Sequence, residues 1–259
     1  MRLTFRSRER RPDKVVTPPL RVDVHSHVLP GIDKGAKTIR QSVDLIYQLT
    51  QLGFRKLIIT PHIMWGYYPN SPQQIKERAN LLRSYLEDEK IDIDIEVAAE
   101  YYLDEHFMKE LLSSNAMLTF KKEGQQEYLL FETERIRESK HLFEAIKRIK
   151  RKGYIPVLAH PERYVYLQNN RILVHQLITL GVLFQVNTIS FAGYYGKEAK
   201  DLADYLSVAQ MISFLGSDCH QEEQLEILEN VMQTTRYQQV IKSKSILNNQ
   251  LARDHSEVS

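Results

Sequence analysis

The chain has 259 residues, of which 42% are hydrophobic and 26% charged, with a formal net charge of +2. This composition suits one large folded domain or two small ones and argues against disorder throughout. Uninterrupted apolar runs reach only four residues, far short of the roughly 20 that a membrane-spanning helix needs. The single cysteine rules out an internal disulfide, and no N-terminal apolar stretch suggests a secretory signal, so we expect a cytoplasmic location.

Positive charge is concentrated at the N-terminus. Residues 1–21 contain seven Lys and Arg against two acidic residues, a net charge of +5, so the other 238 residues, with 28 basic and 31 acidic, carry −3. We interpret residues 1–20 as a flexible basic arm, 21–240 as one folded domain and 241–259 as a polar C-terminal tail. The arm is also suited to peripheral contact with an anionic membrane surface or partner. The mildly acidic body argues against binding to nucleic acid.

From residue 21 onward, short β-branched segments alternate with stretches of helical periodicity. Strands are predicted near 21–25, 57–60, 93–99, 128–132, 155–159, 182–187 and 212–217. Helices are predicted near 38–53, 71–90, 103–113, 139–152, 171–180, 197–209 and 222–234. Seven strand–helix repeats imply right-handed crossovers and a parallel sheet, which fits a closed or nearly closed (β/α) barrel. An open doubly wound sheet is the alternative, but no glycine-rich nucleotide-binding motif follows any strand.

Metal-ligating residue types gather at the ends of the predicted strands. Five of the nine histidines lie there, and so do three acidic residues; the eight are His25, His27, His62, Glu100, Glu132, His160, Asp218 and His220. In parallel (β/α) folds the carboxyl ends of the strands meet at one face, where active sites are built. Taken singly, a strand-end histidine is usually a packing residue and an acid a helix cap or ion-pair partner. The coincidence of eight favours a common site.

The local spacing suggests a metal centre. His25 and His27, two residues apart on extended chain, point to the same side, and Asp218 and His220 repeat this spacing at the last strand. A donor set of nitrogen and oxygen suits Mn, Fe, Zn or Mg rather than a structural thiolate site. Two or three such divalent ions, a few ångströms apart, are the usual apparatus for hydrolysing phosphate esters.

These segments resemble a known family. The relevant stretches are residues 22–33 (VDVHSHVLPGID), 60–62 (TPH), 99–102 (AEYY), 130–132 (LFE), 159–163 (AHPER) and 216–220 (GSDCH). They look like the PHP (polymerase and histidinol phosphatase) superfamily, and within it the bacterial metal-dependent tyrosine-protein phosphatases of the CpsB/YwqE type. The similarity runs from about residue 21 to about 235. It implies a distorted (β/α)7 TIM-like barrel of the PHP type and a trinuclear metal cluster, often of manganese.

The resemblance also implies a substrate and a set of ligands. The expected reaction is the dephosphorylation of tyrosines on a bacterial autokinase that controls capsule or exopolysaccharide synthesis. One ion would take His25, His27, Glu100 and Asp218, and a second would share Glu100. The second ion would add Glu132 and His160, and the third would use His62 and His220 with an aspartate from the first loop.

The first loop departs from the family pattern. Where the family usually has Asp-Asp-Gly, this chain has Asp33, Lys34 and Gly35. A protonated lysine cannot ligate a divalent ion and repels it. Either Asp33 becomes the ligand, or the third site is weak or empty and Lys34 supplies part of its charge, or Lys34 simply points into solvent.

Other residues suggest how a phosphotyrosine would bind. Arg163, three residues after His160, is placed to reach phosphoryl oxygens with its planar guanidinium, and the resemblance gives it a catalytic role beside His160 and Asp218. In the loop at 64–69, Trp65 and Tyr67 are candidates for lining the entrance, and Tyr194 and Tyr195 form a second candidate rim.

Two other kinds of protein remain as alternatives, while thiol chemistry is rejected. A cysteine-based tyrosine phosphatase needs an arginine six residues after the cysteine, and after Cys219 that position is Leu225. The first alternative is a PHP phosphoesterase acting on a small substrate such as histidinol phosphate, or on nucleic-acid ends. The second is a weakly active regulator that binds a phosphorylated tail, and only Lys34 favours it.

Overall fold

The computed structural model describes residues 20–121 and 126–252. Its strands are β1 (Val22–Val24), β2 (Lys56–Ile59), β3 (His62–Ile63), β4 (Asp94–Val97), β5 (Glu100–Tyr102), β6 (Tyr128–Glu132), β7 (Ile155–Ala159), β8 (Leu183–Asn187) and β9 (Ile212–Gly216). Its α-helices are α1 (Ile39–Gln51), α2 (Pro72–Asp88), α3 (Glu105–Glu110), α4 (Leu142–Arg151), α5 (Val165–Gln168), α6 (Arg171–Thr179), α7 (Lys197–Val208), α8 (Glu222–Met232) and α9 (Thr235–Val240). Short 3-10 helices are η1 (Pro161–Arg163), η2 (Thr188–Ala192) and η3 (Asn248–Leu251).

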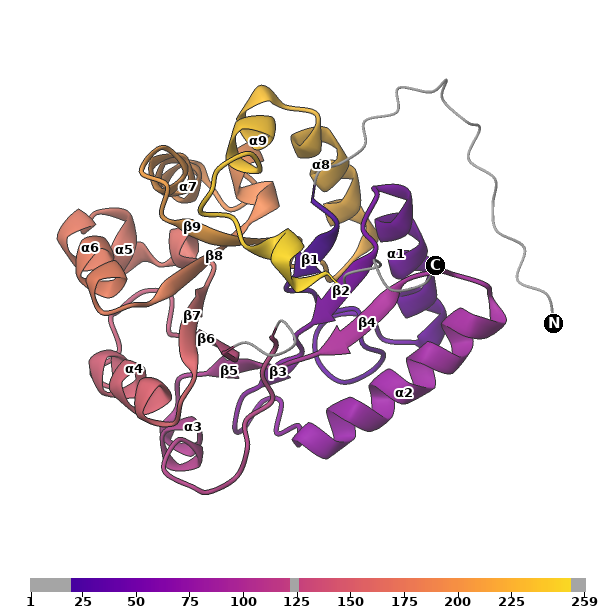
Figure 1. The fold of residues 1–259 in the computed structure, drawn as a ribbon, viewed down its shortest axis with the longest axis horizontal. Coiled ribbons are helices and arrows are strands. Elements are labelled where there is room, and N and C mark those ends of the chain that lie inside the picture. Colours follow the sequence, from indigo (N-terminus) through magenta and orange to yellow (C-terminus); the bar gives the residue numbers. More distant parts are fainter. Residues whose placement is uncertain (1–19, 122–125, 253–259) are drawn as a thin grey trace.

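All paired strands run parallel, in two sheets ordered β1-β2-β4 and β3-β5-β6-β7-β8-β9. β2 and β3 are consecutive pieces of one path, separated by Thr60 and Pro61, and β4 and β5 are separated by two alanines. A parallel bridge between Ser26 and Cys219 joins the end of β1 to the end of β9, so the strand order returns to its start. The predicted α/β fold with a parallel sheet is confirmed. Figure 1 shows the helices outside the strands.

The structure contains two short strands, β3 and β5, that were not predicted, and the break before β3 has a local cause. Pro61 has no N–H and therefore cannot donate to a sheet ladder, which ends β2 before His62 begins β3. The predicted helix at 103–113 is shorter in the structure, as α3, and the short helices α5 and α9 were not predicted. Thr38 caps α1 as expected, because its side chain accepts a hydrogen bond from the Gln41 N–H.

Alternate strand residues supply two separate apolar layers. One cluster contains Val22, Val24, Ile58, Leu130, Val157, Ala159 and Phe214, and it fills the space inside the ring of strands. The intervening residues, among them Leu57, Leu129 and Leu158, belong to the larger cluster between strands and helices. This is the pattern that period-two alternation produces when a sheet closes on itself. The interior is packed, so a site has room only at the ends of the strands.

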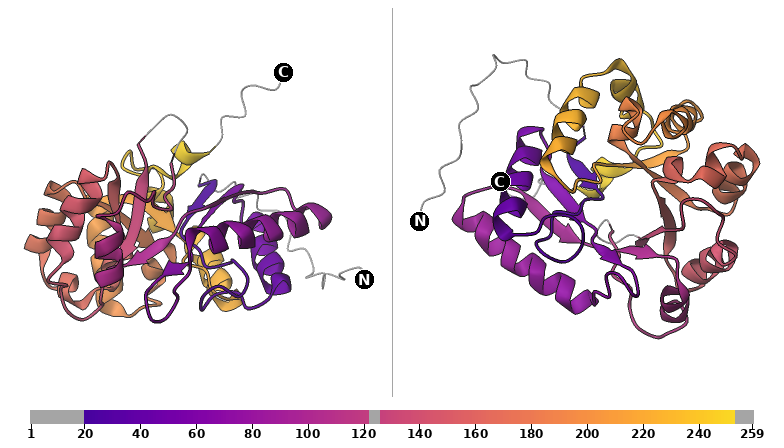
Figure 2. Two further views of the ribbon diagram at one scale, coloured as in Figure 1. Left: turned by 90° about the horizontal axis from the view of Figure 1, so that it is seen from below. Right: turned by 180° about the vertical axis from the view of Figure 1, so that it is seen from behind.

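The chain after α9 packs against the amino ends of the strands. The buried side chain of Asn248 donates to the carbonyls of Val22 and Leu215 and accepts from the Leu215 N–H at 3.0 Å. Lys56, the first residue of β2, donates to the Leu251 carbonyl. Figure 2, left, shows η3 at one end of the strands. The described part of the segment that sequence analysis set apart as a tail, residues 241–252, thus covers the base of the strand ring. No helix in the described ranges is long and apolar enough to cross a bilayer.

Candidate metal centre

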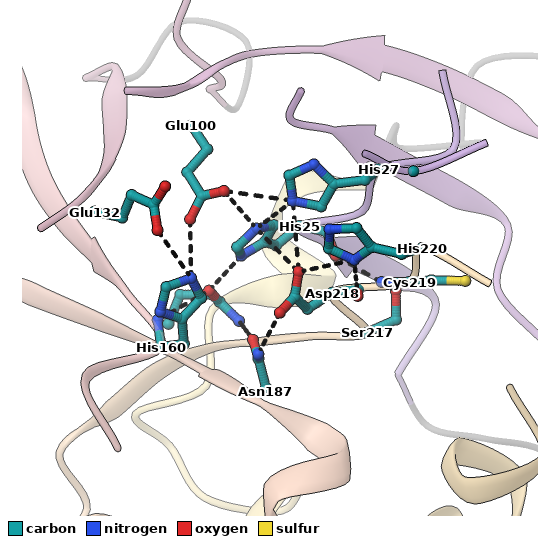
Figure 3. A network of polar contacts seen from close by, with 12 residues as sticks. His25, His27, Glu100, Glu132, His160, Asn187, Ser217, Asp218, Cys219 and His220 are labelled. Atoms are coloured by element: carbon teal, nitrogen blue, oxygen red, sulfur yellow. Dashed lines mark hydrogen bonds and ion pairs between the residues drawn. The ribbon is translucent and has the colours of Figure 1, made fainter. Parts of the chain in front are cut away.

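The eight predicted ligand residues come together at the carboxyl ends of the strands. They line or underlie a cavity of about 270 Å³, and seven of the eight are buried, with His220 partly exposed. They derive from β1, β3, β5, β6, β7 and β9 or the residues just after them. Figure 3 shows most of them facing one another. Segments separated by almost 200 residues therefore form one site, as the parallel strand order predicts.

The backbone is distorted where the ligands leave the strands. His25, His160 and Asp218 have φ values of 118°, 33° and 49°, in the left-handed region that non-glycine residues rarely adopt. Such outliers persist only where the surrounding structure enforces them, and they concentrate at functional sites. Gly216 permits a close approach at the same place, since a Cβ there would lie 2.5 Å from the Val24 carbonyl oxygen. Two of these distortions, at His25 and Asp218, lie where β9 meets β1, and the third, at His160, follows β7.

Glu100 lies at the centre of the cluster. Its Oε2 is 3.3 Å from His25 Nε2, 3.4 Å from His27 Nε2 and 3.0 Å from His62 Nδ1. Its Oε1 lies at hydrogen-bond distance, 2.9 Å, from His160 Nε2. One carboxylate thus contacts four imidazoles, which is the arrangement expected of a ligand that bridges metal ions.

Asp218 presents its two oxygens to different neighbours. Oδ1 faces the imidazoles, at 3.6 Å from His25 Nε2, 3.4 Å from His27 Nε2 and 3.5 Å from His220 Nδ1. Because Oδ1 alone faces these nitrogens, Asp218 is suited to bind an ion through one oxygen.

The other oxygen of Asp218 is held by three donors. Oδ2 accepts from Arg163 Nη1 at 2.8 Å, Asn187 Nδ2 at 2.6 Å and the Tyr195 hydroxyl at 3.2 Å. The guanidinium of Arg163 also lies over the Tyr195 ring, 4.2 Å from its centroid. These contacts fix Asp218 and Arg163 relative to each other at the edge of the cavity.

The donor set fits divalent metal ions. Three groups of residues could each hold an ion, because within each group the ligand atoms all lie within 4.8 Å of one another. The groups are His25, His27 and Glu100; His62, Glu100 and Glu132; and His27, His62 and His220. Among the described residues, both ring nitrogens of His62, Nδ1 of His160 and Oε2 of Glu100 are buried without a hydrogen-bond partner. Buried polar atoms are normally satisfied, and two of these, Nδ1 of His62 and Oε2 of Glu100, lie 3.0 Å apart, as two ligands of one ion can.

The electrostatics of the cluster favour bound cations. Burial opposes charge on His25 and His62, yet nearby carboxylates, Glu100 foremost, outweigh it and raise the pKa of His25 to about 9 and that of His62 to about 10. Burial likewise opposes ionisation of Glu100, but the surrounding imidazoles, His25 foremost, lower its pKa well below the usual range. The carboxylates around His25 and His62 therefore favour positive charge at these two positions, as carboxylates at a site for divalent ions do.

A second layer of side chains orients the imidazoles. Gln185 Oε1 lies 2.6 Å from His25 Nδ1, and Asp33 Oδ2 lies 2.7 Å from His27 Nδ1. Each contact turns Nε2 of the imidazole toward the cluster, the usual role of such partners around metal-binding histidines. Asp33 also accepts from the backbone N–H groups of His62 and Gly35. The structure therefore places Asp33, one of the predicted ligands, behind His27.

Sequence analysis missed Gln185 and Asn187. Both lie on β8, which contributes none of the predicted ligands, and both are completely buried. Gln185 also donates to Asn187 Oδ1 at 3.1 Å, so the two side chains connect His25 to Asp218. The available signal was two polar residues, two positions apart, within an otherwise apolar strand.

The aromatic candidates separate into two pairs. Trp65 stacks on His106, with ring centroids 4.7 Å apart, and neither Trp65 nor Tyr67 is among the residues that line the cavity. Tyr194 and Tyr195 do line it, together with three basic residues, Lys34, Arg135 and Arg163.

Cys219 is unsuited to nucleophilic chemistry. Its side chain is completely buried, and Figure 3 shows its sulfur directed away from the imidazoles. Burial raises the pKa of this thiol far above its usual range, with the nearby Asp23 and Asp218 adding to the shift. A thiolate is the reactive form, so the thiol is inert here.

Comparison with known proteins identifies the family. Residues 21–247 match the family model for capsular polysaccharide synthesis, CpsB/CapC. The chain belongs to this family. The tyrosine-protein phosphatase YwqE of Bacillus subtilis is 30% identical over 199 residues, which cover 77% of each chain. The tyrosine-protein phosphatase CpsB of Streptococcus pneumoniae is 26% identical over 77% of this chain and 82% of that protein.

Solved structures agree with this membership of the CpsB/CapC family. A crystal structure from work on B. subtilis YwqE and S. pneumoniae CpsB, described as unique metal-dependent tyrosine phosphatases, has a TM-score of 0.76 at 27% identity. The match covers 86% of this chain and 89% of that one. The histidinol phosphate phosphatase of Lactococcus lactis shares the fold alone. Its TM-score is 0.51 at 12% identity, and the match covers 82% of this chain and 92% of that one.

Proposed function

We propose that this chain is a metal-dependent protein-tyrosine phosphatase that acts on a tyrosine autokinase of capsule or exopolysaccharide synthesis. The observation that carries the proposal is the convergence of five histidines and three carboxylates beneath a cavity whose lining includes Arg163, Lys34 and Arg135. Relatives named tyrosine-protein phosphatases cover 77% of this chain, and a structural relative is described as metal-dependent.

The ligands would come from the side chains predicted from sequence, except that Asp33 lies behind His27 and His62 would bind the second ion instead of the third. His25, His27, Glu100 and Asp218 face one another around one position, and Glu100 and Glu132 face His62 and His160 around another. Bound there, divalent ions such as Mn would supply Lewis-acid catalysis and charge neutralisation for hydrolysis of a phosphate ester.

Arg163 would bind the phosphoryl group. One of its nitrogens is committed to Asp218, and stacking on Tyr195 fixes the plane of the guanidinium, which leaves other N–H groups for phosphoryl oxygens. Its side chain is only 12% exposed, so it is held in place before substrate arrives. Preorganised donors of this kind stabilise charge that develops in the transition state.

The cavity also suits the aromatic part of the substrate. Tyr194 is 41% exposed at the cavity wall and packs edge-on against Tyr195, with ring centroids 4.9 Å apart. An aromatic wall favours an aryl phosphate over an aliphatic one. The phenolate that departs has a free pKa of about 10, which makes it a comparatively good leaving group without a strong general acid.

The proposal is tested by comparing substrates on the manganese-loaded protein. We expect hydrolysis of a phosphotyrosine peptide and of a simple aryl phosphate, abolished by chelation and restored by added Mn. Histidinol phosphate and a phosphoserine peptide serve as comparison substrates. Preference for histidinol phosphate would replace the proposal with a small-substrate phosphoesterase, and binding without turnover would indicate a phosphopeptide-binding regulator.

A further inference from the structure

The three groups of possible metal ligands are unequal in charge. Two of them contain Glu100, and one of these also contains Glu132, whereas the third consists of His27, His62 and His220 alone. Neutral imidazoles bring no negative charge to balance a divalent ion, and the carboxylate oxygen near His27 and His220, Oδ1 of Asp218, also faces His25 in the first group. Manganese and magnesium also prefer oxygen ligands, while imidazole suits zinc and other later metals. The all-imidazole group is therefore the weakest of the three for manganese.

The all-imidazole group also competes with the other two for its ligands. His27 offers one nitrogen only, because its Nδ1 is 2.7 Å from Asp33. That single nitrogen is needed by the group that contains Glu100 and His25. The Nδ1 atom of His62 lies near the two glutamates, and an ion bound there leaves the ring proton on Nε2, which then cannot bind a second ion. Ions at the two carboxylate-containing groups therefore occupy two of the three imidazoles, and His220 is left.

No carboxylate from the first loop completes this third group. Asp33 accepts three hydrogen bonds, from His27 and from the backbone N–H groups of His62 and Gly35, and is directed behind His27. The next residue is Lys34, which lines the same cavity as His62 and His220. An ammonium group at this wall repels a third divalent ion and attracts a phosphate, which carries up to two negative charges.

We propose that this chain holds two divalent ions rather than three, and that Lys34 binds a phosphoryl oxygen beside His220. Arg163 lines the same cavity, so the phosphate would lie between a guanidinium and an ammonium group. The ion count follows from the ligand groups alone. The role of Lys34 toward the substrate rests on the proposed function.

Metal content tests the first half of this proposal. After loading with Mn and removal of excess, elemental analysis should give two ions per chain for the natural protein and three for Lys34→Asp, which adds the missing carboxylate. Lys76→Asp, the same charge change at an exposed position on α2, should leave two. Three ions in the natural protein, or no gain in Lys34→Asp, would overturn the inference.

Phosphate binding tests the second half without relying on turnover. Titration calorimetry of inorganic phosphate into the Mn-loaded protein should show that Lys34→Met binds phosphate about tenfold more weakly and still holds two ions. The control variant Lys76→Met should bind phosphate with unchanged affinity. Equal phosphate affinity in Lys34→Met would refute the role of Lys34. A protein that meets both expectations but hydrolyses no phosphotyrosine would refute the proposed function and leave this inference standing.

Discussion

Replacement of Asp33 with asparagine distinguishes an orienting carboxylate from a metal ligand. In the structure, Oδ2 of Asp33 contacts His27 Nδ1 at 2.7 Å and the His62 N–H at 3.1 Å, and Oδ1 accepts from the Gly35 N–H at 2.9 Å. The variant Asp33→Asn keeps the size of the side chain but removes its charge. It also retains one accepting oxygen instead of two, so a buried N–H or the His27 ring loses its partner.

The expected cost has two parts. Removal of a partner that orients a metal-binding histidine typically weakens metal affinity about 10- to 100-fold, which corresponds to roughly 1.4–2.8 kcal/mol. The unpaired buried donor should lower the free energy of unfolding of the metal-free protein by about 1–3 kcal/mol. The number of bound ions should not change, because the ligands themselves remain in place.

Calorimetric titration with Mn gives affinity and stoichiometry in one measurement. Asp44→Asn makes the same chemical change at a position on α1 that is 41% exposed, where Asp44 pairs with Arg40, so little effect is expected. Loss of one whole ion from Asp33→Asn would show that this carboxylate is itself a ligand. Undiminished affinity would refute the orienting role as well.

Four further outcomes are expected. In a steady-state assay, Cys219→Ser should retain most of the aryl phosphatase activity, whereas His160→Ala should lose nearly all of it. The reverse result would refute the metal-centred site. Tyr195→Phe, which keeps the ring under Arg163 but removes the hydroxyl from Asp218, should lower kcat/KM about tenfold. Asn248→Ala should reduce the free energy of unfolding by about 2–4 kcal/mol in urea titrations, because it leaves buried backbone groups unpaired, with activity unchanged below the transition. Chelation should lower the melting temperature, and excess Mn should raise it again.

The strands and the eight converging side chains could be predicted from sequence for a simple physical reason. Parallel strands place their carboxyl ends at one face, so the positions of His62 or Glu132 relative to a strand end were enough to predict their meeting. Short β-branched segments located β1, β2, β4, β6, β7, β8 and β9, but not the short strands β3 and β5.

The supporting residues could not be predicted in the same way. Whether Asp33 faces the ions or lies behind His27 depends on side-chain direction within an irregular loop, which no periodicity describes. Gln185 contacts His25 from a strand 160 residues away, a relation that exists only after the ring of strands forms. Asn248 gave no signal either, because its partners are backbone groups of the first and last strands.

The seam between β1 and β9 joins the stability of the fold to the chemistry of the site. Asp23 accepts from both the backbone N–H and the hydroxyl of Ser217, at 2.7 and 2.6 Å, and the Asp218 N–H donates to the His25 carbonyl. These bonds link segments almost 200 residues apart, and the same two segments carry ligands of the first candidate ion. An ion held by His25 and Asp218 would add a cross-link where the loop that must close is longest, and therefore where closure costs the most chain entropy. Metal loading should consequently strengthen this seam more than the sheet between β6 and β7, whose strands are neighbours in sequence.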